Sequence, residues 1–298
     1  MGQDQFSQQD PTGQQPRPGS GNKPVEYPGR TAELDVQPDH GERTYRGIGR
    51  LVDKKTVITG GDSGIGRAVA LAFAREGADV LISYLESEEQ DAKQTVALVE
   101  EAGRRAVTVC GDVREEAMCR RVVDRAVEEF GQIDVLVSNA AYQMSQPGGI
   151  AEITTGQLDR VFKTNVYAMF WLCKAAIPHM PPGSAIITSS SVQAFQPSAH
   201  LLDYAASKGA IVTFTKALGA DLMEQGIRVN SVAPGPVWTP LIPATMPKEM
   251  LESFGKQSPM GRAGQPAELA PIYVFLASQE SSYITSEVIG VTGGSPIT

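Results

Sequence analysis

The chain has 298 residues, of which 41% are hydrophobic and 20% charged, a composition typical of a globular protein that folds in water. The formal net charge is −8 and basic residues form no block, which argues against nucleic acid and anionic membranes as partners. There is no basic and apolar N-terminal signal, no apolar run long enough to span a membrane, and no metal or redox spacing among Cys110, Cys119 and Cys173, so we expect a cytoplasmic protein without a metal.

The first fifty residues differ in composition from the rest of the chain. Gln, Pro, Gly, Asp and Arg dominate them, and such a segment cannot bury enough apolar surface to fold alone. We therefore divide the chain into a polar N-terminal extension, residues 1–50, and one folded domain, residues 51–298. Residues 1–20 are expected to be mobile. Residues 24–50 are either disordered or a strap held on the domain by spaced apolar side chains, namely Tyr27, Leu34, Val36, Tyr45 and Ile48.

From Lys54 onwards, short β-branched runs alternate strictly with longer segments of helical periodicity. The pattern predicts strands at 56–59, 78–84, 105–110, 133–138, 185–190, 227–233 and 288–291, and helices at 65–75, 88–102, 114–130, 155–177, 203–225 and 266–279. This alternation indicates an α/β fold, a Rossmann-type doubly wound parallel sheet with helices on both faces. Residues 240–262 are rich in Pro and Met without a clear period, which predicts a mobile lid over a cleft.

A glycine-rich turn joins the first predicted strand to the first predicted helix. Gly60, Gly64 and Gly66 follow the strand directly, where glycines permit a tight turn and let backbone amides approach a pyrophosphate. The spacing is G-x-x-x-G-x-G rather than the usual G-x-G-x-x-G. We expect this turn, including Asp62, Ser63 and Ile65, to bind a dinucleotide.

A second pattern, Tyr204 and Lys208 four residues apart at the start of a predicted helix, points to acid–base chemistry. Both side chains project from one face of the helix, and a nearby ammonium can lower the pKa of a phenol. Ser191 stands thirteen residues before Tyr204 at the end of a predicted strand, where its hydroxyl could bond a substrate oxygen. This pattern alone is common by chance. It indicates an active site here because the same chain also has a predicted dinucleotide-binding turn.

Taken in order, these motifs resemble the short-chain dehydrogenase/reductase family from about Leu51 to the C-terminus. The long polar N-terminal extension also resembles that of a bacterial branch of this family, the general stress proteins and glucose dehydrogenase-like oxidoreductases. The resemblance implies cofactor contacts by Asp112 and Val113, Asn139 and Ala140, Pro234 and Gly235, Val237, Thr239, Tyr84, Tyr204 and Lys208, and catalysis by Ser191, Tyr204, Lys208 and Asn165. It also implies a homotetramer in which helices 155–177 and 203–225 pack across subunits.

The expected activity is reversible hydride transfer between NAD(P)(H) and a small carbonyl or alcohol substrate, with aldehyde or ketone reduction favoured. In this scheme Lys208 lowers the pKa of Tyr204, and Asn165 holds a water molecule on the proton path. A sugar or polyol dehydrogenase is the alternative within the enzymes, and a redox-silent dinucleotide sensor is the alternative outside them. Ala141 departs from the family's usual glycine. Tyr84 replaces the aspartate of many NAD users, which favours NADP(H) over NAD(H) with weak discrimination.

Overall fold

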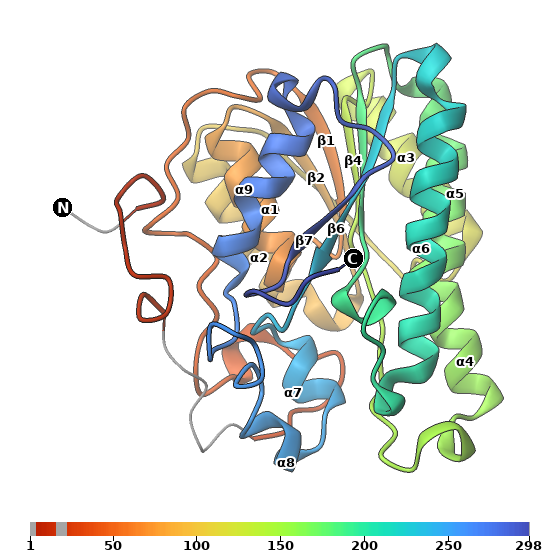
Figure 1. Cartoon of the computed structure of the whole chain (residues 1–298). Coiled ribbons are helices and arrows are strands. Elements are labelled where there is room, and N and C mark those ends of the chain that lie inside the picture. The colour runs from red at the N-terminus through yellow and green to blue at the C-terminus, as the bar shows by residue number, and fades with distance from the viewer. Residues whose placement is uncertain (1–3, 16–22, 298) are drawn as a thin grey trace.

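The computed structural model describes residues 4–15 and 23–297. Its centre is a sheet of seven parallel strands in the order β3-β2-β1-β4-β5-β6-β7 (Figure 1). The strands are β1 (Lys55–Thr59), β2 (Asp79–Tyr84), β3 (Ala106–Cys110), β4 (Val135–Ser138), β5 (Ala185–Ser189), β6 (Arg228–Pro234) and β7 (Val288–Val291). The strand order reverses between β1 and β4, and doubly wound sheets bind ligands at the carboxyl ends of the strands at this point. The predicted fold class is confirmed.

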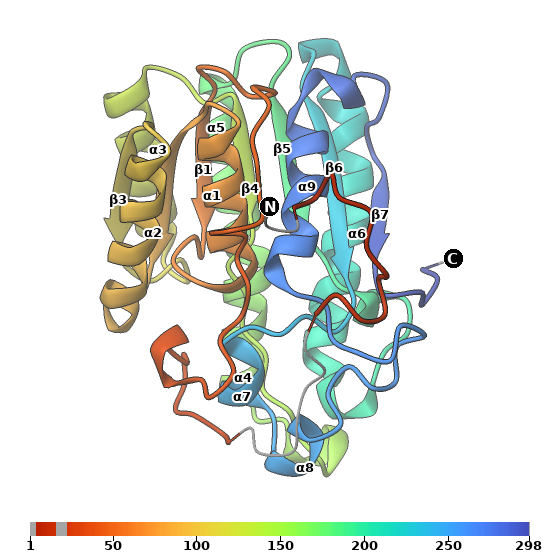
Figure 2. The same ribbon diagram turned by 90° about the vertical axis from the view of Figure 1, so that its left-hand side faces the viewer.

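Helices cover both faces of the sheet. They are α1 (Gly64–Arg75), α2 (Glu89–Glu101), α3 (Glu116–Phe130), α4 (Thr155–Phe162), α5 (Ala168–Ala176), α6 (Leu202–Asp221), α7 (Leu241–Thr245), α8 (Lys248–Leu251) and α9 (Pro266–Ala277). One face carries α1, α2 and α9, and the other carries α3, α5 and α6 (Figures 1 and 2). The short helices α7 and α8 lie within the predicted lid.

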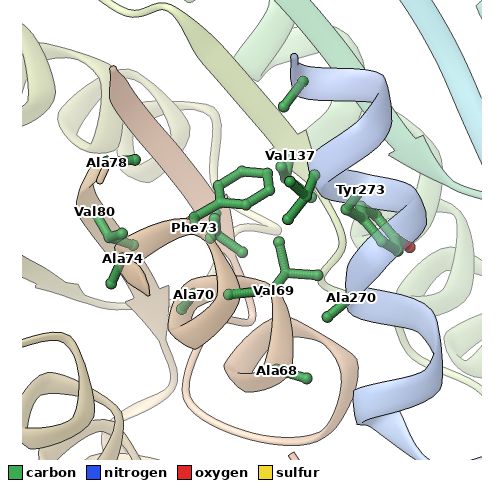
Figure 3. Packing of buried hydrophobic residues seen from close by; sticks show 14 of the residues in the cluster. Ala68, Val69, Ala70, Phe73, Ala74, Ala78, Val80, Val137, Ala270 and Tyr273 are labelled. Carbon is green, nitrogen blue, oxygen red and sulfur yellow. The ribbon is translucent and has the colours of Figure 1, made fainter. Parts of the chain in front are cut away.

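The alanine-rich helix α1 packs closely against α9 and the sheet. Phe73 and Val69 point from α1 towards Tyr273 and Ala270 on α9, with Val137 of β4 beneath them (Figure 3). All five side chains are almost completely buried. Because α1 begins at the glycine turn, this packing fixes the position of the turn at the carboxyl end of β1.

The predicted helical stretch over residues 155–177 is present, but its hydrogen bonding changes at the centre. A π-helical segment, Lys163–Tyr167, separates α4 from α5 and contains Asn165. The buried Asn165 side chain bonds the backbone of Tyr142 and the hydroxyl of Ser207 instead of facing solvent. Single-turn π segments are rare and occur frequently at functional sites.

In Figure 2, residues 4–15 (red) run past α9, and residues 23–35 (red-orange) lie below the sheet near α7. The residues that follow, up to 50 (orange), run beside α9 and α1. Among the expected anchors, Leu34 and Tyr45 are buried, Tyr27 and Val36 are partly buried, and Ile48 is 64% exposed. The expectation that Ile48 anchors the extension by its side chain is therefore wrong. Its backbone amide bonds the carboxylate of Glu76 instead.

Residues 4–15 also lie against the domain, unlike the free tail expected from their composition. Gln14 donates a hydrogen bond to Glu268 on α9, and the carbonyl oxygen of Pro11 accepts one from Arg262. Polar side chains and backbone groups make these contacts, which apolar content does not predict. The remainder of the segment expected to be mobile, residues 1–3 and 16–20, lies outside the described residues.

Glu76, just after α1, holds the end of the extension. Its carboxylate is completely buried and accepts hydrogen bonds from the Arg50 side chain and backbone, the Tyr45 hydroxyl and the Ile48 amide. Burial alone would raise the pKa of Glu76, but these bonds outweigh it and lower the pKa to about 2. The ionised form is thus the one that the folded chain stabilises.

We predict that Glu76→Gln lowers the free energy of unfolding by about 2–4 kcal/mol at pH 7, because buried donors lose their charged acceptor. Since folding lowers the pKa of Glu76, its contribution is complete above about pH 4.5 and is lost as the pH falls towards 2. The difference from the wild type should shrink over that range in denaturant titrations. Glu280→Gln is the matched control, because this exposed partner lies 3.8 Å from Arg50. A control loss equal to that of Glu76→Gln would contradict the prediction.

Candidate functional site

A cavity of about 540 Å³ opens at the carboxyl ends of the strands, a volume within the range of small-molecule and cofactor sites. The fold brings nearly all the predicted site residues to its walls. Those lining it are Gly60, Asp62, Ser63, Gly64, Ile65, Tyr84, Asp112, Val113, Asn139, Ala140, Ser191, Tyr204, Lys208, Pro234, Gly235, Val237 and Thr239. Gly66 and Asn165 do not line it and lie behind the wall.

The position of Gly66 has a steric reason. A Cβ built on Gly66 would stand 1.8 Å from the carbonyl oxygen of Gly60, so no other residue fits the turn without moving it. Gly60 has a φ of +61°, and its Cβ would stand 3.1 Å from the Cα of Ala140. The sequence-based expectation that Gly66 contacts the ligand is replaced by a role in shaping the turn.

A small hydrogen-bond network joins the glycine turn to the end of β4. The Thr59 hydroxyl accepts hydrogen bonds from the amides of Asn139, at 3.0 Å, and Ala140, at 3.1 Å. The Asn139 side-chain amide donates to the carbonyl oxygens of Thr59 and Gly60. Asn139 therefore stabilises the conformation of the turn, and Ala140 and Ala141 form the neighbouring wall of the cavity.

Two buried polar atoms at the cavity have no hydrogen-bond partner among the described residues. They are Oδ2 of Asp62 and Oγ of Ser83, in residues that are each 1% exposed. Buried polar atoms without partners are rare in proteins and call for a ligand or water. The hydroxyl groups of a ribose are ligand groups of the kind that could bond such atoms, so this part of the cavity fits a dinucleotide.

The same end of the cavity contains a second carboxylate, Glu88, which sequence reasoning missed. Burial raises the pKa of Asp62 and that of Glu88, and repulsion between the two carboxylates raises the pKa of Glu88 further. Both groups therefore take up protons more readily than ordinary carboxylates. The Tyr84 hydroxyl donates to the Glu89 carboxylate; burial first and this bond second raise the pKa of Tyr84 to about 12.

Ser191, Tyr204 and Lys208 meet at the opposite end of the cavity. Lys208 is 2% exposed, and its ammonium lies 5.3 Å from the centre of the Tyr204 ring and donates to the carbonyl oxygen of Ser189 at 2.7 Å. Burial raises the pKa of Tyr204 to about 12, and a hydrogen bond with the Ser191 hydroxyl partly opposes that rise. Burial lowers the pKa of Lys208 to about 7.

These values correct one expectation from the sequence. Lys208 was expected to lower the pKa of Tyr204, yet in this structure the pKa of Tyr204 is raised. The physical reason is that Lys208 bonds the carbonyl oxygen of Ser189 and is itself too deeply buried to keep its full charge near neutral pH. The site thus stabilises a protonated phenol.

Asp112 and its neighbours form the wall at the end of β3. The Arg114 guanidinium bonds the Asp112 carboxylate, and the Arg114 amide bonds it as well. Burial of Asp112 would raise its pKa, but these bonds prevail and hold the pKa below its ordinary value. Asp112 is therefore ionised, with an arginine already paired to it.

Several lining residues escaped the sequence analysis: Tyr27, Pro28, Glu88, Arg114 and Arg160. Tyr27 was expected to be an anchor of the extension, but no local signal placed it at the cavity. Arg160 lies on α4, one turn before the π-helical segment, and only the tertiary fold brings it to the wall.

No helix within residues 4–15 and 23–297 is long and apolar enough to cross a membrane. The same residues contain no group of three or more His, Cys, Asp or Glu side chains able to hold a metal ion.

Comparison with known proteins decides the family. A family model described as enoyl-(acyl carrier protein) reductase matches residues 60–295. General stress protein 39 of Bacillus subtilis is 48% identical over 91% of this chain and 94% of its own length. The chain belongs to the short-chain dehydrogenase/reductase family. The predicted resemblance to the general stress protein branch is confirmed.

Two further short-chain dehydrogenase/reductase relatives bear on chemistry. The chloroplastic NADPH-dependent aldehyde reductase 1 of Arabidopsis thaliana is 46% identical over 91% of this chain and 96% of its own length. The crystal structure of a short-chain dehydrogenase from Burkholderia cenocepacia in complex with NADP superposes with a TM-score of 0.77. It is 32% identical and covers 82% of this chain and 98% of that one. The protein is accordingly a nicotinamide-dependent oxidoreductase of carbonyl and alcohol groups.

Proposed function

We propose that this short-chain dehydrogenase/reductase reduces aldehydes or ketones with NADPH, with Ser191, Tyr204 and Lys208 as its catalytic residues. The observation that carries the proposal is that Ser191, Tyr204 and Lys208 line the same cavity as the glycine turn. A bound nicotinamide would supply the hydride. The protein's part is to bind the carbonyl oxygen and to supply the proton.

In this proposal the Ser191 hydroxyl donates a hydrogen bond to the substrate oxygen, and the Tyr204 phenol transfers its proton to that oxygen as negative charge develops. A tyrosine whose pKa is raised to about 12 is fully protonated at neutral pH, so the group is ready as an acid and rarely available as a base. A sugar or polyol dehydrogenase would need the phenolate.

Lys208 and Asn165 support the proton donor. Lys208 would hold the nicotinamide ribose through its ammonium, which already lies against the tyrosine ring. The Asn165 amide is fully engaged with Tyr142 and Ser207, so it positions the wall beside Tyr204. We also propose that Asn165 fixes a water molecule on the proton path. Because its side chain is engaged, a backbone carbonyl oxygen of the π-helical segment would accept the hydrogen bond from that water.

We predict that Tyr204→Phe lowers kcat for aldehyde reduction by a factor of about 100–10,000, because only the proton donor is removed. Binding of NADPH, measured by the change in cofactor fluorescence, should stay within about threefold of the wild type. Tyr283→Phe is the control, since that phenol is fully exposed. Retention of more than about 10% of kcat would remove Tyr204 from the mechanism. Turnover of sugars or polyols but not aldehydes by the wild type would favour the alternative dehydrogenase, and no turnover with either would favour a redox-silent sensor.

We further propose that NADP(H) is the preferred cofactor, contacted by the cavity residues named above. Position 84 is a tyrosine and not the aspartate of many NAD-dependent relatives, and the Ser83 hydroxyl, which has no partner among the described residues, is available to the adenosine ribose. Asp62 and Glu88 oppose a 2′-phosphate only when ionised, and their raised pKa values lessen that opposition. The names of the Arabidopsis and Burkholderia relatives support the same cofactor.

We expect NADPH to bind at least as tightly as NADH, with a modest ratio because both carboxylates remain close to the ribose. Titrations of cofactor fluorescence from pH 8 to pH 6 should show the ratio moving towards NADPH as Asp62 and Glu88 take up protons. Asp62→Asn should reduce this pH dependence, whereas Asp221→Asn, at an exposed residue at the end of α6, should not. A preference for NADH above 100-fold, or about 2.7 kcal/mol, would contradict the proposal.

We propose that the protein is a cytoplasmic homotetramer in which helices 155–177 and 203–225 pack across subunits. Tyr167 and Phe170 on this side of the molecule are 47% and 52% exposed, although both are large and apolar. Phe170 makes an edge contact with Phe214 of α6, which extends the apolar surface to the second helix. Such a surface is typical of a protein interface.

The expected result of Phe170→Asp is a smaller mass in size-exclusion chromatography with light scattering, because a charge would be buried at the interface. Val52→Asp, at a 60% exposed valine elsewhere on the surface, is the control and should leave the tetramer intact. A monomeric wild type would contradict the proposed assembly.

A further inference from the structure

A short segment of the N-terminal extension crosses the cavity, away from the catalytic residues. We define residues 25–31 as the cleft segment. Its first amide, on Val25, bonds the carbonyl oxygen of Pro243 in α7, and its last, on Thr31, bonds the buried Asp91 carboxylate in α2. Tyr27 and Pro28, between these two attachments, line the cavity. The cleft segment is thus attached on both sides of the opening.

The Tyr27 ring is held from a third side by α4. The Arg160 guanidinium lies between two aromatic rings, 4.4 Å from the centre of Tyr27 and 4.1 Å from that of Tyr142. The two rings meet edge to face, with centres 5.1 Å apart. Cation–π and edge contacts of this kind stabilise the position of a segment that has little apolar surface of its own.

Charge and position show which part of the cavity the cleft segment covers. Tyr27 lines the cavity together with Glu88, Asp112, Arg114 and Arg160. Tyr27 therefore stands between the start of α2, the end of β3 and α4, which surround the proposed adenosine end. Among the described residues Arg160 makes no ion pair, so its charge is available to an anion in the cavity.

We propose that Tyr27 and Arg160 are additional cofactor-binding residues, and that the cleft segment closes over the adenosine end of a bound dinucleotide. Cofactor exchange then requires the cleft segment to lift from α7 and α4, while the substrate end of the cavity stays unchanged. The proposal rests on the proposed function, since it presupposes that the cavity binds NADP(H). It assigns to the extension a part in cofactor retention.

The test is the rate at which NADPH leaves the full-length protein, measured by stopped-flow fluorescence after mixing with excess NADP⁺. Tyr27→Ala should accelerate release by a factor of 10 or more, and Tyr27→Phe should stay within threefold of the wild type because the ring makes the contacts. Arg160→Met, which keeps the aliphatic stem, should accelerate release as well. Tyr283→Ala removes a fully exposed ring and should have no effect.

KM for the aldehyde should change less than twofold in Tyr27→Ala, because Tyr27 lies at the proposed adenosine end of the cavity, with Glu88 and Arg114. Melting curves without cofactor establish that each variant is folded. Unchanged release in both Tyr27→Ala and Arg160→Met would overturn the inference, as would slower release or tighter binding, which would make Tyr27 an obstruction. A wild type that binds no NADPH would instead overturn the proposed function itself.

Discussion

The site depends on one junction, where the Thr59 hydroxyl at the end of β1 accepts the amides of Asn139 and Ala140 beyond β4. The two strands run side by side, but the helices that follow them leave on opposite faces of the sheet. A crevice must open between those helices, and the junction fixes its width. The Asn139 side chain fixes the conformation of the glycine turn by donating hydrogen bonds to the carbonyl oxygens of Thr59 and Gly60.

The chemistry within the crevice follows from burial. The interior disfavours charge on acids and bases alike, so the pKa of Tyr204 rises while that of Lys208 falls. At the other end, Asp62 and Glu88 are displaced towards their neutral forms for the same reason. Lys208, Asp62 and Glu88 thus have pKa values near neutral pH, so the charge of a bound ligand can change their protonation.

The sequence was sufficient for the fold and for most of the residues at the cavity, since strand–helix alternation and motif spacing are local patterns. Gly66 was predicted at the ligand because its neighbours are there, whereas its own place is decided by contact with Gly60. The π-helical segment around Asn165 could not be predicted, because it accompanies bonds to Tyr142, which is distant in the sequence. Arg160 and Tyr27 meet only through tertiary structure.

The route of the extension has a consequence for biosynthesis. Gln14, Val36 and Asp39 reach their hydrogen-bond partners Glu268, Trp238 and Ala267, which stand more than 200 positions later in the chain. Proteins are made from the N-terminus, at about 5–20 residues per second, so the first segment to leave the ribosome must wait for α9 before it can dock. The part of the molecule that is synthesised first is among the last to reach its final position.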